Sequence, residues 1–171
     1  SLKIALDKRG YDVLTPVQQE VSKPELNTSD LLVSAQTGSG KTVGFGIAIA
    51  SNLLPDDGSF DRAAAPLGLV IAPTRELALQ VKRELQWLYA EASVVMASCV
   101  GGMDMRDERR ALERGAHIVV ATPGRLRDHI MRKTIDLSQI RAVVLDEADE
   151  MLDLGFAEDL EMILEETPKS R

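Results

Sequence analysis

The amino-acid sequence predicts an α/β domain with a mainly parallel sheet and helices on both faces. Short apolar segments alternate along the chain with longer amphipathic ones, as in strands joined by helical crossovers. The apolar segments are rich in Val, Ile and Leu with little polar alternation, which is typical of strands covered on both faces. A Gly-rich stretch follows the first of them, at the carboxyl end of a predicted strand, where such sheets bind ligands.

The predicted elements follow one another in a regular order. Strands are expected at 30–35, 67–72, 93–100, 117–121 and 141–146. Helices are expected at 41–54, 75–90, 105–114, 125–132 and 156–166, with shorter ones at 2–8 and 17–21. Leu77, Val81, Leu85 and Leu88 place one apolar face on the helix at 75–90. Residues 55–66, rich in Pro, Asp, Gly and Ala, indicate a surface loop.

Composition limits the class of protein. A chain of 171 residues fits one domain with a real core, and 44% hydrophobic with 27% charged residues is typical of a globular protein. No apolar segment is long enough to span a bilayer, so we expect no membrane contact and a cytoplasmic location. Cys99 is the single cysteine, which excludes an internal disulfide. The net charge of -7 argues against a broadly basic nucleic-acid-binding face but permits a narrow one.

The Gly-rich stretch at residues 35–42 reads Ala-Gln-Thr-Gly-Ser-Gly-Lys-Thr. Gly38 and Gly40 permit a tight turn whose amides, with the helix N-terminus, can surround a phosphate. Lys41 is expected to neutralise the outer phosphates, and the hydroxyl of Thr42 to coordinate magnesium. The alternative is a Gly-rich turn before an ordinary helix, which the preceding strand and a later acidic pair disfavour.

That acidic pair, Asp146 and Glu147, stands directly after the apolar segment 142–145. Asp146 is expected to hold magnesium through water, and Glu147 to orient and deprotonate an attacking water. A simple helix start is the alternative, because acids favour the first turn of a helix. That alternative accounts for Glu147 and Asp149 but not for the strand before Asp146. With the phosphate loop, the pair indicates a nucleoside-triphosphatase core.

Residues 146–149, Asp-Glu-Ala-Asp, spell the motif that names the DEAD-box helicases, and the chain resembles this family over essentially its whole length. Residues 35–42 match the family's phosphate loop, including its initial alanine. Residues 73–78 match its first RNA-contacting motif, and Gly101-Gly102 and residues 122–125 match two more. Gly10-Tyr11 and residues 14–18 resemble its glutamine motif, although Leu14 replaces the usual proline.

The resemblance implies a three-layer, RecA-like P-loop domain that binds ATP and Mg²⁺. The glutamine motif implies that Gln18 reads adenine, which its amide could do with two hydrogen bonds; alone, it would look like an ordinary polar helix residue. Lys41, Asp146 and Glu147 are the expected catalytic residues, with Thr42 and Asp146 at the metal. The expected nucleotide-binding residues are Tyr11, Thr15, Gln18, Gln36, Thr37, Gly38, Ser39, Gly40, Lys41 and Thr42.

For RNA, two arginines could form charged forks to phosphates, while hydroxyls and Gly backbone amides add neutral hydrogen bonds. Such contacts follow the sugar-phosphate chain, so binding independent of base sequence is expected. Singly, these residues also suit plain structural roles as turns, helix caps or surface charges. The expected RNA-contacting residues are Pro73, Thr74, Arg75, Gly101, Gly102, Thr122, Pro123, Gly124 and Arg125.

The expected function is that of an ATP-dependent RNA helicase core, whose parent protein couples ATP hydrolysis to local unwinding of RNA duplexes. One alternative is an ATP-gated RNA clamp that anchors partners without unwinding. Another is a DNA-directed or transport ATPase, which residues 15–18 and 73–78 disfavour. We expect residues 1–171 to form the N-terminal RecA-like domain, and a second such domain to complete the ATP site.

Two further family features fall outside the sequence. The aromatic residue that stacks on adenine would precede Ser1, and a strand ending in Ser-Ala-Thr would follow Arg171. In related ATPases that strand lies between the phosphate-loop strand and the strand bearing the acids. We therefore expect either a fragment with a gap in its sheet, which we favour, or a gap closed in another way. Alone, the chain is expected to bind nucleotide and hydrolyse it very slowly.

Overall fold

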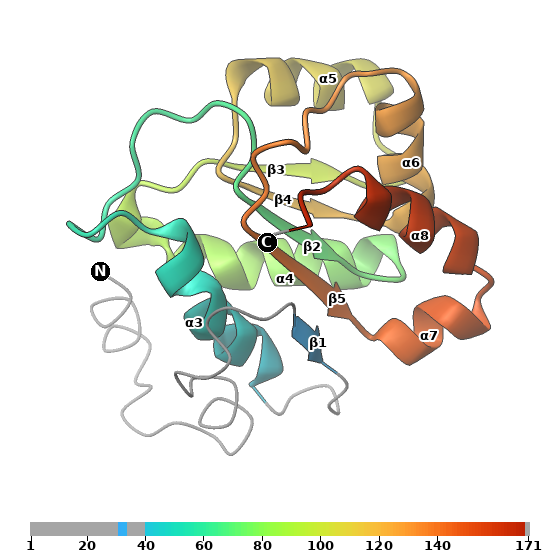
Figure 1. The fold of residues 1–171 in the computed structure, drawn as a ribbon, viewed down its shortest axis with the longest axis horizontal. Coiled ribbons are helices and arrows are strands. Elements are labelled where there is room, and N and C mark those ends of the chain that lie inside the picture. The colour runs from blue at the N-terminus through green and yellow to red at the C-terminus, as the bar shows by residue number, and fades with distance from the viewer. Residues whose placement is uncertain (1–30, 34–39, 170–171) are drawn as a thin grey trace.

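The structure is a computed structural model that describes residues 31–33 and 40–169. Its centre is a parallel sheet of five strands in the order β1-β5-β2-β4-β3 (Figure 1). The strands are β1 Leu31–Val33, β2 Gly68–Ile71, β3 Met96–Cys99, β4 Ile118–Ala121 and β5 Ala142–Asp146. Within the described residues every strand pairing is parallel, as the sequence predicts.

In the described part of the chain, seven helical segments join and cover the strands. They are α3 Lys41–Leu53, α4 Arg75–Leu88, the 3₁₀ turn η2 Ala90–Ala92, α5 Met105–Arg114, α6 Pro123–Met131, α7 Ala148–Asp153 and α8 Ala157–Glu165. None of the described helices is long and apolar enough to cross a bilayer.

Both faces of the sheet are buried, which explains the apolar strand sequences. All residues of β2 and β4 are buried, and neighbouring side chains along a strand point to opposite faces. Leu69 and Ile71 therefore pack into one core, and Val70 into the other. The three-layer α/β architecture expected from the sequence is confirmed.

One core lies under α3 and α4. Phe45, Ile49 and Leu53 of α3 pack there with the apolar face of α4 that the sequence predicts. The two helices approach closely at Gly46, where an added Cβ would lie 2.6 Å from the Leu88 side chain. The hydroxyl of Tyr89 donates a hydrogen bond of 2.6 Å to the Gly46 carbonyl.

The other core lies under α5, α6, α7 and α8. Leu126 of α6, Met151 of α7, and Leu160 and Ile163 of α8 are buried there against the sheet. Cys99, at the end of β3, is also fully buried in this core. Figure 1 shows α6 and α8 side by side at one end of the molecule.

Predicted and observed elements differ mainly at their ends. The helix 105–114 is confirmed, but β3 is shorter than predicted because residues 93–95 form no strand pairing. Helix α6 begins at Pro123, two positions before the predicted start, because proline suits the first helical turn. Helix α7 and η2 were not predicted, and the loop at 55–66 is confirmed. The predicted helices at 2–8 and 17–21 lie outside the described residues.

The expected gap in the sheet is absent from the structure. β1 pairs directly with β5, with Leu31 beside Val144 and Val33 beside Asp146. The expectation of a gap was therefore wrong for this chain, because β1 satisfies its backbone groups on β5. The pairing of β1 with β5 corrects only the expected gap and does not bear on the expectation that the chain is a fragment.

Because α3 and α4 approach closely at Gly46, a larger side chain at this position should destabilise the fold. Gly46→Val should lower the free energy of unfolding by about 1–3 kcal/mol, because its side chain would overlap Leu85 and Leu88. Gly124→Val is the matched control: nothing lies within 4 Å of a Cβ at Gly124, so the change should stay within about 0.5 kcal/mol. Chemical denaturation measures both, and equal losses would contradict the packing argument.

Candidate functional site

Each described segment that is predicted to bind a ligand ends or follows a strand, so the parallel sheet brings these described segments to one edge. The strand order divides them into two groups. The acids follow β5, next to β1, while the predicted RNA-contacting residues follow β2, β4 and β3 on the other side of β5. A nucleotide group and an RNA group thus lie along the same edge.

Part of the predicted nucleotide group falls outside the described residues, namely Tyr11, Thr15, Gln18, Gln36, Thr37, Gly38 and Ser39. Its described part begins with Gly40, which has a left-handed backbone (φ 78°) at the N-cap of α3. This conformation suits glycine, because a Cβ would be strained there. It directs the first turn of α3, which carries Lys41 and Thr42, toward the end of β5.

Lys41 is the centre of the nucleotide group. Its side chain is 9% exposed, and its Nζ lies 3.0 Å from Oδ1 of Asp146 and also pairs with Oε1 of Glu147. Burial lowers the pKa of Lys41, but its contacts with Glu147 and Asp146 outweigh this, and the pKa lies above its usual value. The structure therefore brings together the three residues predicted to be catalytic.

Asp146 is buried, with 1% of its surface exposed. Burial raises the pKa of its carboxyl, and the neighbouring Lys41 only partly offsets this. Its Oδ1, although paired with Lys41, is not in hydrogen-bond geometry with any donor in the described part of the chain. A buried carboxylate oxygen with spare acceptor capacity is well suited to a hard cation.

Glu147 has a left-handed backbone, with φ 56° and ψ 48°, and is the N-cap of α7. Such a conformation costs a non-glycine residue about 1–2 kcal/mol. It turns the chain sharply after β5, so that adjacent residues can both reach Lys41. Both interpretations of the acidic pair therefore hold structurally, since the acids end a strand and also begin a helix.

The RNA group gathers at the ends of β2, β3 and β4. Thr74 caps α4, accepting a hydrogen bond of 3.3 Å from the Leu77 amide, and Thr122 is the N-cap of α6 without a side-chain capping bond. Pro73 and Pro123 are buried, whereas Arg75, Gly101, Gly102 and Gly124 are exposed. The turn and cap roles weighed from the sequence are thus real, and they leave polar groups at the surface.

Contacts join the three segments of the RNA group. Gly102 has a φ of 83°, and a Cβ there would lie 2.7 Å from Nη1 of Arg75, so the arginine packs directly over the glycine. Arg75 also approaches the Met103 sulfur at 3.4 Å, and Nη1 of Arg125 donates to the Met103 carbonyl at 3.0 Å. Two predicted phosphate-binding arginines therefore flank the Gly101-Gly102 turn.

Two residues beneath this surface were missed by the sequence analysis. Glu108 of α5, only 5% exposed, pairs with Arg125 at 2.9 Å, and the fully buried His129 contacts the same carboxylate oxygen at 2.9 Å. A signal existed, because an acid at position 108 shares the inward face of α5 with Met105 and Leu112.

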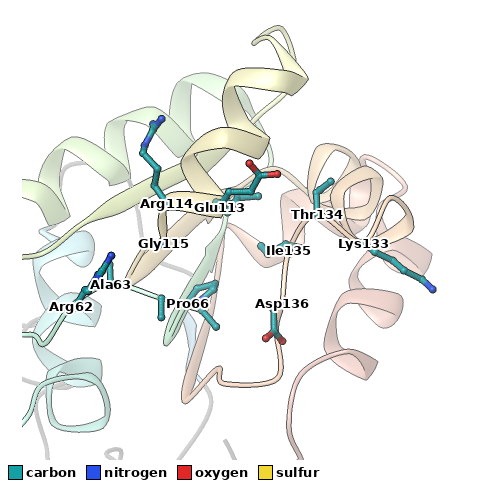
Figure 2. Close-up of a pocket in the computed structure, with 13 residues that line it drawn as sticks. Arg62, Ala63, Pro66, Glu113, Arg114, Gly115, Lys133, Thr134, Ile135 and Asp136 are labelled. Carbon is teal, nitrogen blue, oxygen red and sulfur yellow. The ribbon is translucent and has the colours of Figure 1, made fainter.

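A separate cleft of about 470 Å³ lies at the opposite, amino-terminal edge of the sheet. Figure 2 shows residues before β2, β4 and β5 lining it, among them Pro66, Gly115 and Ile135. Charged side chains of both signs surround it, including Arg114 and Glu113. No residue predicted to bind nucleotide or RNA lines this cleft.

Comparisons with known proteins agree with this geometry. A sequence model described as DEAD/DEAH box helicase matches residues 15–171. The ATP-dependent RNA helicase CshA of Limosilactobacillus reuteri is 42% identical over 171 residues, 100% of this chain and 33% of that protein. The DEAD-box ATP-dependent RNA helicase CshA of Geobacillus kaustophilus is 42% identical over 98% of this chain and 34% of its own length. The chain thus spans about a third of these curated relatives.

Solved structures show the same fold. A DEAD box protein from Methanococcus jannaschii superposes with a TM-score of 0.85 and 36% identity, over 98% of this chain and 44% of that one. A hypothetical ATP-dependent RNA helicase from Sulfolobus tokodaii superposes with a TM-score of 0.83 and 35% identity. The match covers 97% of this chain and 46% of that one. Motifs, fold and comparisons lead to one conclusion: the chain belongs to the DEAD/DEAH box helicase family and has its RecA-like fold.

Proposed function

We propose that this chain is the N-terminal RecA-like domain of a cytoplasmic ATP-dependent RNA helicase. It would bind ATP with magnesium beside β1 and β5, and the backbone of single-stranded RNA beside β2, β4 and β3. The observation that carries the proposal is the convergence of Lys41, Asp146 and Glu147 at one end of the sheet edge that also carries Arg75 and Arg125.

In the nucleotide group, Lys41 would leave its ion pairs and bind the outer phosphates of ATP. This exchange replaces two carboxylate partners by phosphate oxygens and keeps the buried ammonium paired, as its burial requires. Glu147 is then released from Lys41 and can accept a proton from the attacking water. Nucleotide binding would thereby free Glu147 to act as the general base.

The residues present fit a magnesium ion. Asp146 offers a buried carboxylate oxygen with spare acceptor capacity, and Thr42 a hydroxyl in the first turn of α3. Within the described residues no three His, Cys, Asp or Glu side chains form a cage, and magnesium normally takes few protein ligands beside phosphate and water. Bound magnesium would neutralise charge on the ATP phosphates.

In the RNA group, the expected contacts are to phosphate and sugar. Arg75 and Arg125 flank an exposed glycine turn, and the hydroxyl of Thr74, which accepts from Leu77, keeps its hydrogen for donation. Contacts of this kind to phosphate and sugar carry no information about the bases, so binding independent of sequence is expected. The net charge of -7 confines the attraction to this patch.

The whole protein would couple ATP hydrolysis to local RNA unwinding, with a second RecA-like domain in the length that the relatives have beyond this match. The clamp without unwinding is not favoured, because the relatives are named helicases. A DNA-directed or transport ATPase is disfavoured for the same reason.

Removal of the proposed base tests the enzymatic part. In the full-length protein carrying this chain, Glu147→Gln should lower RNA-stimulated ATP turnover by about 10²–10⁴-fold, the usual contribution of a general base. ATP and RNA binding should persist, so the variant should accumulate as an ATP- and RNA-bound complex. Phosphate release measures the first effect, and the amount of labelled RNA retained on the protein in the presence of ATP measures the second.

The matched control is Glu150→Gln, which removes an exposed acid from α7 and should leave turnover within about twofold. Unchanged turnover in Glu147→Gln would mean that another group is the base. Equal losses in both variants would show that only the charge of α7 matters.

The salt dependence of RNA affinity reports how many phosphates the protein neutralises. Arg75→Ala should weaken RNA binding for every base sequence, and should reduce the slope of log K against log salt by about 0.7. Arg83→Ala removes the same charge from an exposed position of α4 outside the RNA group and should leave the slope unchanged. Titration of labelled single-stranded RNA at several salt concentrations tests both; a sequence-dependent loss would contradict backbone recognition.

A further inference from the structure

Glu108 is a buried acid that neither ATP chemistry nor RNA contact requires directly. It lies on the inward face of α5 with 5% of its surface exposed. An ionised carboxylate in that position is very unfavourable unless donors surround it. Because burial of this charge costs free energy, we ask which neighbouring groups the carboxylate holds in place.

Three donors satisfy the carboxylate. Oε1 accepts hydrogen bonds from Nη1 of Arg125 and Nε2 of His129, both at 2.9 Å, and Oε2 accepts from the Val100 amide at 2.8 Å. Burial raises the pKa of Glu108, but these three hydrogen bonds outweigh it and hold the pKa below its usual value. The group is therefore ionised and fully engaged at neutral pH.

These donors come from segments that also present the RNA group. Val100 directly precedes the Gly101-Gly102 turn, and Arg125 is itself predicted to bind phosphate. His129, fully buried one turn after Arg125, contacts Oγ1 of Thr134 through its other ring nitrogen at 2.6 Å. One carboxylate thus joins the end of β3 to α6, and the imidazole joins both to the segment that follows α6.

Arg125 is held by one nitrogen only. Nη1 donates to Glu108 and to the Met103 carbonyl, while no hydrogen bond from Nη2 or Nε is found within the described residues. The Arg125 side chain is 16% exposed, so part of the guanidinium reaches the surface. Because a long arginine loses much rotamer freedom when it binds a phosphate, a guanidinium already fixed loses less.

We propose that Glu108 and His129 are positioning residues that hold Arg125 in place beside the Gly101-Gly102 turn for contact with an RNA phosphate. The proposal rests on the proposed function, since it assigns the geometry of that same RNA surface. His129 would act by fixing the Glu108 carboxylate, and Glu108 by turning Nη1 of Arg125 inward so that the rest of the guanidinium faces the phosphate.

A competing effect has the opposite sign. The negative charge of Glu108 partly cancels that of Arg125 and so weakens long-range attraction for RNA. Positioning predicts that removal of the carboxylate weakens RNA binding, whereas charge cancellation predicts that it tightens binding. The direction of change therefore discriminates between the two.

A double-mutant cycle in the full-length protein tests the proposal. Glu108→Ala, Arg125→Ala and the combined variant are titrated with fluorescent oligouridine RNA in the presence of a non-hydrolysable ATP analogue. Glu108→Ala should bind RNA about tenfold more weakly when Arg125 is present, the scale of coupling within one hydrogen-bond network, and should cause no further loss when Arg125 is absent. Affinity for the ATP analogue alone should not change.

Two further variants control for charge and folding. Glu113→Ala removes an exposed acid from the same helix and should leave RNA affinity unchanged. Glu108→Gln keeps the size of the side chain and some of its hydrogen bonds, so its RNA affinity should lie between wild type and Glu108→Ala. If Glu108→Ala does not fold, the cycle is run with Glu108→Gln, which should show the same dependence on Arg125 at smaller amplitude.

The outcomes separate the inference from the proposed function. An equal loss with and without Arg125 would show a merely structural Glu108 and overturn the positioning role, as would tighter RNA binding by Glu108→Ala. If Arg125→Ala itself leaves RNA affinity unchanged, the assignment of Arg125 to the RNA surface is wrong, and the inference is lost with it. Loss confined to proteins that retain Arg125 is the supporting result.

Discussion

Parallel pairing of all the described strands places every carboxyl end at one edge of the sheet. The rest of the molecule depends on this constraint. Parallel strands need helical crossovers, so both faces of the sheet become covered, and the loops that carry chemistry all emerge at the same edge. Residues as distant in sequence as Lys41 and Glu147, or Arg75 and Gly102, meet there.

The order of strands along that edge also brings the two groups near each other. β5, which ends in Asp146, pairs with β2, which leads into Pro73 and Thr74. Neighbouring strands are about 4.8 Å apart, so the acids and the first RNA-contacting segment are separated by a single strand spacing. In the proposed function, this closeness would let a shift of one loop on nucleotide binding displace the other.

Local rules predict much of this fold from the sequence. The apolar runs mark the strands, and the spacing of Val81, Leu85 and Leu88 gives the buried face of α4. Adjacent motifs also predict that Lys41 and the acids converge. The pairing of β1 with β5 and the path of α7 could not be predicted, because strand order depends on long-range packing that no local pattern encodes. The Glu108 network was missed because an acid on a helix is usually solvent-exposed, and only its partners from two other segments make burial tolerable.

In both charged clusters at the sheet edge, a buried charge is neutralised by groups of opposite charge or by hydrogen-bond donors. The buried charge is positive in one cluster and negative in the other. At Lys41 a buried cation is neutralised by two acids, which in the proposed function would release it to the phosphates of ATP. At Glu108 a buried anion is neutralised by neighbouring donors, one of which, Arg125, is proposed to bind phosphate with the rest of its guanidinium. An acidic chain can attract a polyanion only where its negative groups are buried or paired. Glu108 meets that requirement, because its charge is buried and paired; in the proposed role it would fix the RNA group without exposing a negative charge at the surface.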